Sequence, residues 1–140
     1  MTDCIFCAIL TGQAAGSFLY RDDLCAAIMD IHQPTVGKLL VIPNLHATYL
    51  ADLPPETGTR MFQVAQQLAA ALRRSGLRCE GNNLFLSDGS AAGQDVFHTH
   101  LHVLPRFAGD GIKLRFGQGA DSYPERAELE RIAEQIRQVL

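Results

Sequence analysis

Hydrophobic residues recur with helical spacing in two parts of the chain. Between residues 55 and 72 they return every three or four positions, which predicts an amphipathic helix with Met61, Val64, Ala65, Leu68 and Leu72 on its buried face. The sequence Pro54-Pro55-Glu56 is typical of a helix start. The same spacing predicts a closing helix marked by Leu129, Ile132, Ile136 and Val139. A short apolar stretch over residues 4–11 predicts one or two further helical turns.

Runs rich in residues that favour strands fill much of the remaining chain. Residues 17–20 and 24–30 flank a polar turn, Arg21-Asp22-Asp23, which predicts a hairpin. Further strands are expected over 38–42, 84–86 and 96–104, with Pro43 and Pro105 ending the first and the last. Strands in pairs, with helices between and after them, predict an α+β fold, an antiparallel sheet covered by helices on one side. Because we find no linker or repeat, we expect one domain over residues 1–140.

Composition limits the classes of partner. The 140 residues are 47% hydrophobic and 19% charged, as in an ordinary soluble globular protein. A net charge of -3 argues against a nucleic-acid polymer, which needs a basic face, but it allows a mononucleotide. We find no run near the ~20 apolar residues of a membrane span, and Met1-Thr2-Asp3-Cys4 lacks the basic region of a signal peptide. We therefore expect a cytoplasmic protein without a membrane partner.

Three histidines alternate along the strand expected over 96–104. On a strand, His98, His100 and His102 share one face. They could simply be half-buried members of a polar face, but imidazoles are costly core residues because each nitrogen needs a partner when buried. Three in alternation indicate function instead: one to bind metal, one to attack phosphorus and one to hold an oxygen. The preceding small residues, Gly89 to Gly93, form a loop whose backbone N–H groups a phosphate could approach.

Two cysteines near the N-terminus have the spacing of a metal site. Cys4 and Cys7 are separated by two residues, so both thiolates can reach one tetrahedral zinc ion. The other ligands must come from elsewhere, and either His46 or His98 would be a suitable nitrogen ligand. The alternatives are two packed thiols or a redox pair.

These residues together resemble a known family. The segment over 93–106, GQDVFHTHLHVLPR, resembles the histidine triad nucleotide-binding signature. The likeness extends to DCIFC at 3–7, AIMDI at 27–31 and LVIP at 40–43. It runs from about Asp3 to Phe116 and leaves out the C-terminal tail and helix over 117–140.

The resemblance implies a mechanism and a metal. It implies a homodimer in which His100 attacks the α-phosphorus and carries the nucleotidyl group until water removes it, while His102 donates to a phosphate oxygen. In relatives that begin with Cys-x-x-Cys, the first triad histidine binds zinc. Carried over to this chain, the ligands of a structural zinc ion are Cys4, Cys7, His46 and His98.

The resemblance also implies a purine nucleotide pocket for an AMP or GMP moiety. Asp30 matches the residue that binds the ribose hydroxyls, and four apolar residues match those that sandwich the base: Ile5, Phe6, Ile28 and Ile31. Residues expected near the phosphates are Ser87, Gly93, Gln94, Asp95 and Val96. The chain departs from the family pattern at four positions: Ser87 for Asn or Gln, Asp95 for Ser or Thr, Lys38 for His, and Thr99 for an apolar residue.

The function expected is that of a nucleotide hydrolase. It would cleave nucleoside phosphoramidates or dinucleoside polyphosphates at the α-phosphate through a nucleotidyl-histidine intermediate. Two alternatives remain open at this point. One is a nucleotide sensor or scaffold with little catalysis, and the other is a catalytic metal centre formed by the His-x-His pair.

Overall fold

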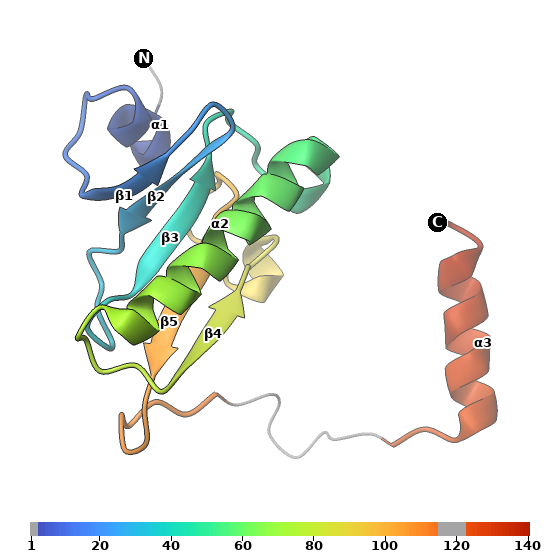
Figure 1. The fold of residues 1–140 in the computed structure, drawn as a ribbon. Helices are drawn as coiled ribbons and strands as arrows, with labels where there is room; N and C mark the ends of the chain where they lie inside the picture. The colour runs from blue at the N-terminus through green and yellow to red at the C-terminus, as the bar shows by residue number, and fades with distance from the viewer. Residues whose placement is uncertain (1–2, 115–122) are drawn as a thin grey trace. The chain divides into compact units, whose positions relative to one another are not determined.

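The computed structural model describes residues 3–114 and 123–140, and its central feature is a five-stranded antiparallel sheet (Figure 1). The strand order is β1-β2-β3-β5-β4. The strands are β1 Phe18–Arg21, β2 Cys25–Met29, β3 Leu39–Pro43, β4 Gly81–Phe85 and β5 Leu101–Arg106. Every neighbouring pair runs antiparallel, which confirms the α+β class expected from the sequence.

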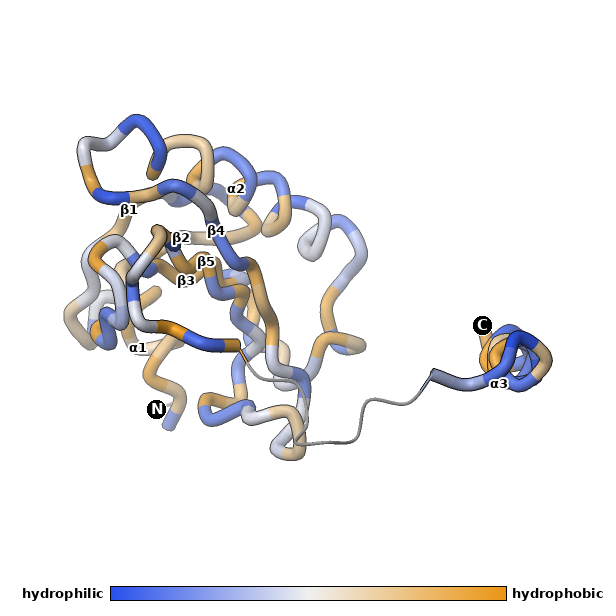
Figure 2. The backbone as a smooth tube through the Cα atoms, turned by 90° about the horizontal axis from the view of Figure 1, so that it is seen from below, coloured by the Kyte–Doolittle hydropathy of each residue, from blue (hydrophilic) through white to orange (hydrophobic). Residues whose placement is uncertain are grey.

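Alternation along the central strands gives the sheet two apolar faces. On one face Ala27, Val41 and Val103 pack under the long helix α2, Pro55–Arg74. On the other face Ile28 and Leu40 pack against the short helix α1, Ile5–Leu10. The expectation that helices cover one side of the sheet was therefore wrong. Because β2 and β3 are buried on both faces, they are continuous apolar runs, and Figure 2 shows these strands in hydrophobic colours.

Helix α2 forms where the sequence predicts it and is two residues longer. Pro55 fits the first turn, where a missing N–H costs nothing, and Arg73 and Arg74 lie in the last turn, where positive charge offsets the helix dipole. Its buried residues are Thr57, Met61, Val64, Ala65 and Leu72. In Figure 2 hydrophilic and hydrophobic stretches alternate along the coils of α2.

Strand β5 begins later than expected. It pairs with β3 only from Leu101, opposite Val41. The preceding amide of Thr99 instead donates to the carbonyl of Ala47, which lies beyond the end of β3 at Pro43. His98 and His100 therefore precede the strand, and the expectation that three histidines share it was wrong; only His102 lies in β5.

The loop before the histidines is a tight, internally bonded turn. A 3-10 helix, η2 Ser90–Ala92, lies between Gly89 and Gly93, whose φ angles of 90° and 88° favour glycine. The amides of Gly93 and Gln94 donate to the carbonyls of Ser90 and Gly89. A second 3-10 helix, η1 Leu50–Asp52, precedes α2.

Residues 111–140 form a second unit, described by itself. Its helix α3, Arg126–Arg137, confirms the closing helix, although Val139 lies beyond its end. Residues 117–122 of the C-terminal tail lie outside the described residues. Among the described residues no helix is both long and apolar enough to cross a membrane. The single domain over 1–140 and the cytoplasmic location stay predictions.

Candidate functional site

Two cysteines and two histidines converge beside the start of α1. Cys4 precedes α1 and Cys7 lies in its first turn, while His46 follows β3 and His98 precedes β5. Their four ligand atoms lie within 4.8 Å of one another. His98 Nδ1 is 3.4 Å from Cys4 Sγ and 3.5 Å from Cys7 Sγ, and His46 Nδ1 is 3.4 Å from Cys7 Sγ. The set predicted from the sequence is thus assembled in full.

The geometry of this cluster fits a structural zinc ion. A tetrahedral zinc with ordinary bond lengths separates a sulfur and a nitrogen ligand by about 3.6 Å, close to the separations found. His98 Nε2 lies 3.0 Å from the carbonyl oxygen of Pro43. Because that oxygen only accepts hydrogen bonds, Nε2 carries the proton and Nδ1 keeps a lone pair that can bind a metal. Burial lowers the pKa of His98, which also favours the neutral ligand. Four protein ligands leave no open position, so the ion would hold α1 against the segments that carry His46 and His98.

His100 presents a free ring nitrogen to a cavity. Its ring is 4% exposed, and Nδ1 lies 2.8 Å from the carbonyl of His98. Because a carbonyl only accepts, Nδ1 carries the proton and Nε2 carries the lone pair. Nε2 lies 4.0 Å from a carboxylate oxygen of Asp95. The ring is held edge-on against Phe6, with centroids 5.1 Å apart.

His102 lies next to His100 and is held by stacking rather than by a carbonyl. Its ring is parallel to that of Phe85, with centroids 4.2 Å apart, and is 4.8 Å from the ring of His100. Its buried Nδ1 has no hydrogen-bond partner in the described structure, so no carbonyl fixes its tautomer. Burial, followed by the positive charge of Lys38, lowers the pKa of His102 to about 4. At neutral pH His102 is an uncharged hydrogen-bonding group.

The two histidines line a cavity of about 770 Å³ whose wall also contains many apolar residues. This volume falls within the usual range for small-molecule sites. The four residues predicted to sandwich a base all line it: Ile5, Phe6, Ile28 and Ile31. The cavity is also lined by Ile9, Met29 and Leu40, which were not predicted from the sequence. For Ile9 a sequence signal was present, since it lies one helical turn from Ile5. The place of Leu40 follows only from the structure, which pairs it with His102 across β3 and β5.

Asp30 and Lys38 form an ion pair in the wall of the same cavity. Lys38 Nζ donates to Asp30 Oδ2 at 2.5 Å, and the two side chains are only 8% and 12% exposed. The other oxygen of Asp30 accepts the His32 amide at 2.9 Å. Burial alone would raise the pKa of Asp30, but the bonds from Lys38 and His32 lower it, so the carboxylate is ionised. From the sequence, Lys38 is only a departure from the family pattern, and this pairing was not predicted.

The predicted phosphate-side residues divide into two groups. Asp95 and Val96 line the cavity. Ser87, Gly93 and Gln94 are not among the residues that line it. The side chain of Gln94 is occupied within the loop, since it accepts the Gly89 amide and donates to the Thr48 and Val96 carbonyls. The nucleotide-binding roles of Ser87, Gly93 and Gln94 stay predictions.

Comparison with known proteins places this geometry in a family. The sequence model of the HIT domain matches residues 11–109. A crystal structure of a HIT family protein from Bacillus anthracis str. 'Ames Ancestor' has a TM-score of 0.88 and 35% identity, covering 99% of this chain and 97% of that chain. A Zn-bound histidine triad family protein from Mycobacterium smegmatis has a TM-score of 0.77 and 42% identity, covering 99% and 98%.

One curated relative has a named activity. Adenylylsulfatase HINT3 of Arabidopsis thaliana is 36% identical over 104 residues, which are 74% of this chain and 52% of that protein. The Zn-bound relative supports a structural zinc ion at Cys4, Cys7, His46 and His98. The domain match, the sheet and the histidine arrangement agree, and the chain belongs to the HIT, or histidine triad, family.

Proposed function

We propose that this protein is a hydrolase of nucleotide conjugates that transfers a nucleoside monophosphate to His100 and then to water. The observation that carries the proposal is the hydrogen bond from His100 Nδ1 to the carbonyl of His98, which leaves the Nε2 lone pair beside the cavity. A fixed tautomer aimed at a nucleotide-sized cavity suits a nucleophile. The name of the plant relative, an adenylylsulfatase, is consistent with attack on an adenylyl group.

The reaction has two displacements. In the first, the Nε2 lone pair of His100 forms a bond to the α-phosphorus, and the bond from phosphorus to the leaving group breaks with its electron pair on the leaving atom. A leaving nitrogen then takes a proton from solvent, whereas a leaving phosphate departs as an anion. In the second, water attacks phosphorus, the nitrogen–phosphorus bond breaks, and the water proton returns to solvent. Substrates of this class are nucleoside phosphoramidates and dinucleoside polyphosphates.

The other residues bind and orient the substrate. The apolar lining residues Ile5, Phe6, Ile28 and Ile31 would hold a purine base without choosing sharply between AMP and GMP moieties. Asp30, already ionised by Lys38, would accept the ribose hydroxyls with its remaining lone pairs. His102, uncharged near pH 7, would donate one hydrogen bond to a phosphate oxygen. Zinc at the cysteine–histidine cluster would position α1 and His98.

Replacing His100 by Asn tests the proposal. We expect turnover of an adenosine phosphoramidate to fall by at least ~10³-fold, because the nucleophile is lost. The dissociation constant for AMP, measured by calorimetry, should change by less than about threefold, because the base and ribose contacts remain. His32→Asn is the matched control, since His32 is an exposed histidine that lines the same cavity.

Two results would contradict the proposal. Undiminished turnover in the His100→Asn protein would exclude His100 as the nucleophile. Tight AMP binding by wild-type protein, with no turnover of any phosphoramidate or dinucleoside polyphosphate, would favour a nucleotide sensor or scaffold instead. Homodimerisation is a separate prediction, which sedimentation equilibrium of the full chain tests.

A further inference from the structure

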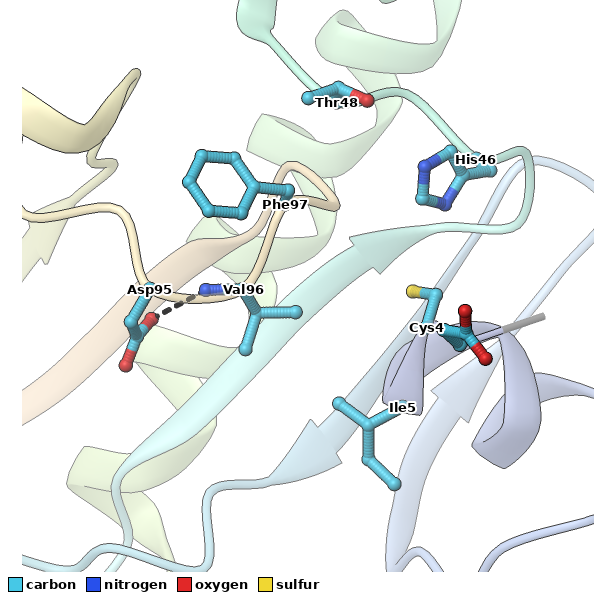
Figure 3. A pocket seen from close by; sticks show the side chains of 8 residues that line it. Cys4, Ile5, His46, Thr48, Asp95, Val96 and Phe97 are labelled. Carbon is cyan, nitrogen blue, oxygen red and sulfur yellow. Dashed lines mark hydrogen bonds between the residues drawn. The ribbon is translucent and has the colours of Figure 1, made fainter.

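Two carboxylates line the proposed nucleotide pocket, and their surroundings differ. Among the described residues, the titratable side chains in its wall are Asp30, Lys38, Asp95 and three histidines. The Asp95 side chain is 86% exposed and accepts the amide of Val96 at 2.9 Å, the contact drawn as a dashed line in Figure 3. The Asp30 side chain is only 12% exposed and is paired with the ammonium group of Lys38. The buried carboxylate is therefore the one whose charge is neutralised.

The loop between β2 and β3 fixes both members of this pair. The side chain of Gln33 donates to the carbonyls of Asp30 and Lys38, at 2.6 and 2.7 Å. The Asp30 amide also donates to the Lys38 carbonyl at 3.2 Å. Gln33 is itself held, because its Oε1 accepts the Gly37 amide at 2.7 Å. The pair is thus in place before a ligand binds, which lowers the cost of ordering the site.

Lys38 and Asp30 keep hydrogen-bonding capacity after they have bonded to each other. An ammonium group has three N–H donors, and in the described part of the chain the one hydrogen-bond acceptor of Lys38 Nζ is Asp30 Oδ2. The ring of Phe85, centred 5.8 Å from Nζ, can engage a second donor, so at least one donor remains. Each Asp30 oxygen accepts one bond, from Lys38 or from the His32 amide, and keeps a further lone pair. Because both side chains line the cavity, this capacity is available to a ligand there.

The charges of the pair favour an uncharged ligand group that both donates and accepts hydrogen bonds. A phosphate oxygen would be attracted by Lys38 but repelled by the carboxylate that Lys38 bonds, so the pair gives an anion little net attraction. A hydroxyl group suits both members, because it donates its proton to Asp30 while its oxygen accepts from Lys38. A second hydroxyl on the neighbouring carbon, on the same side of the ring, would donate to the other Asp30 oxygen. The pair therefore fits the vicinal hydroxyls of ribose.

We infer that Lys38 is a specificity-determining residue that donates a hydrogen bond to a ribose hydroxyl of the substrate, while Asp30 accepts the proton of the same hydroxyl. This inference rests on the proposed function and deepens it, because there Asp30 alone binds the ribose. The family pattern has His at this position, and an uncharged imidazole has a single N–H, which a bond to Asp30 would use up. Lysine can bond Asp30 and the ligand at once. The expected effect is selection of ribonucleotides over nucleotides that lack one ribose hydroxyl.

Nucleotides that differ only at the ribose test this inference in the wild-type full chain. Calorimetry would compare AMP with 2′-deoxy-AMP, 3′-deoxy-AMP and the two analogues that carry fluorine in place of the missing hydroxyl. Loss of the hydroxyl that lies between Asp30 and Lys38 should weaken binding by at least ~10-fold, because a bond to each charged group is lost. Fluorine cannot donate but carries partial negative charge that attracts an ammonium group. The matching fluoro analogue should therefore bind about two- to threefold more tightly than the deoxy analogue.

The same substitution at two lysines assigns the selectivity to Lys38. In Lys38→Met, the weakening caused by the missing hydroxyl should fall to less than about threefold, and the gain from fluorine should disappear. Lys113→Met is the matched control: Lys113 is an exposed lysine that does not line the cavity, and both ratios should stay unchanged. Because Lys38→Met leaves Asp30 without its partner, circular dichroism checks its fold. The wild-type comparison of fluoro and deoxy analogues decides the inference even where this variant does not fold.

The contrary outcomes are distinct. Equal affinities of wild-type protein for AMP and both deoxy analogues would overturn the role of Lys38, and so would fluoro analogues that bind no more tightly than the deoxy analogues. Either result would leave AMP binding and hydrolysis at His100 intact. Unchanged ratios in folded Lys38→Met protein would also overturn it. Failure of wild-type protein to bind AMP itself would overturn the proposed function, and with it this inference.

Discussion

At the scale of single residues, the three histidines differ because their surroundings differ. His98 and His100 each use one ring nitrogen to bond a backbone carbonyl, whereas the buried Nδ1 of His102 has no partner in the described structure. The sequence predicted all three as functional. It could not predict their separate environments, because those depend on the Pro43 and His98 carbonyls and on the ring of Phe85, which the fold brings into place.

The lowered pKa of His102 predicts a dependence of stability on pH. The pKa is about 4 in the folded protein and near its ordinary ~6.5 when unfolded, so between these values the unfolded chain binds more protons. Through this difference in pKa, the free energy of unfolding is highest above about pH 6.5. It falls by about 1 to 3 kcal/mol as pH drops toward 4. Urea unfolding at several pH values measures it.

A His102→Gln variant separates this contribution from other acid effects. Glutamine cannot titrate, so the loss of unfolding free energy between pH 7 and pH 5 should be smaller in the variant than in wild type. Identical losses in the two proteins would show that His102 has an ordinary pKa in the fold.

The Asp30–Lys38 pair predicts a non-additive effect of two substitutions. Lys38→Met leaves a buried carboxylate without its partner, so it should lower the free energy of unfolding by about 3 kcal/mol. Adding Asp30→Asn removes that unpaired charge and should restore part of the loss. A double-mutant cycle by urea unfolding measures the coupling, and strictly additive effects would contradict a strong pair.

Among the helices and strands, sequence periodicity located most elements but did not predict which surfaces pack together. Helix α2 was predicted because its apolar residues are regularly spaced, and the central strands were predicted because they are strand-favouring runs next to turn residues or proline. The placement of α1 on the opposite face was not, because a six-residue helix has too few positions to reveal which surface it covers. The alternation of His98 to His102 also suggested strand upstream of Leu101, where the Thr99 amide bonds a loop carbonyl instead.

The turn before β3 requires glycine at Gly37, so substitution by alanine should destabilise the protein there but not at Gly58. Its φ is +107°, and an added Cβ would lie 3.1 Å from atoms of Leu72 and Leu77. Gly37→Ala should therefore lower the free energy of unfolding by about 1 to 3 kcal/mol. The control Gly58→Ala lies in α2 with open space around it and should raise stability by up to ~1 kcal/mol. Urea unfolding of both variants checks this, and equal effects would contradict it.

At the scale of the whole molecule, the cysteine–histidine cluster joins three distant parts of the chain. The sequence supplied Cys4 and Cys7 by spacing, and the resemblance supplied His46 and His98. Spacing alone could not choose between these histidines, because their approach to the cysteines depends on where β3 ends and β5 begins. The sheet provides that placement.

Loss of one zinc ligand should reduce both metal content and thermal stability. Cys7→Ser should lower bound zinc from about one ion per chain toward none and lower the melting temperature by at least ~5 °C, because the ligands no longer tie α1 to the histidine segments. Metal analysis and thermal melts measure the two effects. Cys79→Ser is the control, since Cys79 lies outside the cluster and should keep its zinc. Full zinc content in the Cys7→Ser protein would contradict the site.

In the proposed function, His100 carries the nucleotidyl group during catalysis. The most direct measurement is rapid quenching of wild-type protein with an adenosine phosphoramidate, followed by peptide mass spectrometry under conditions that preserve nitrogen–phosphorus bonds. We expect one adenylyl group on the peptide that contains His100, formed and lost at rates compatible with turnover and absent from the His100→Asn protein. Turnover without any adenylylated intermediate, or adenylylation at another residue, would contradict it.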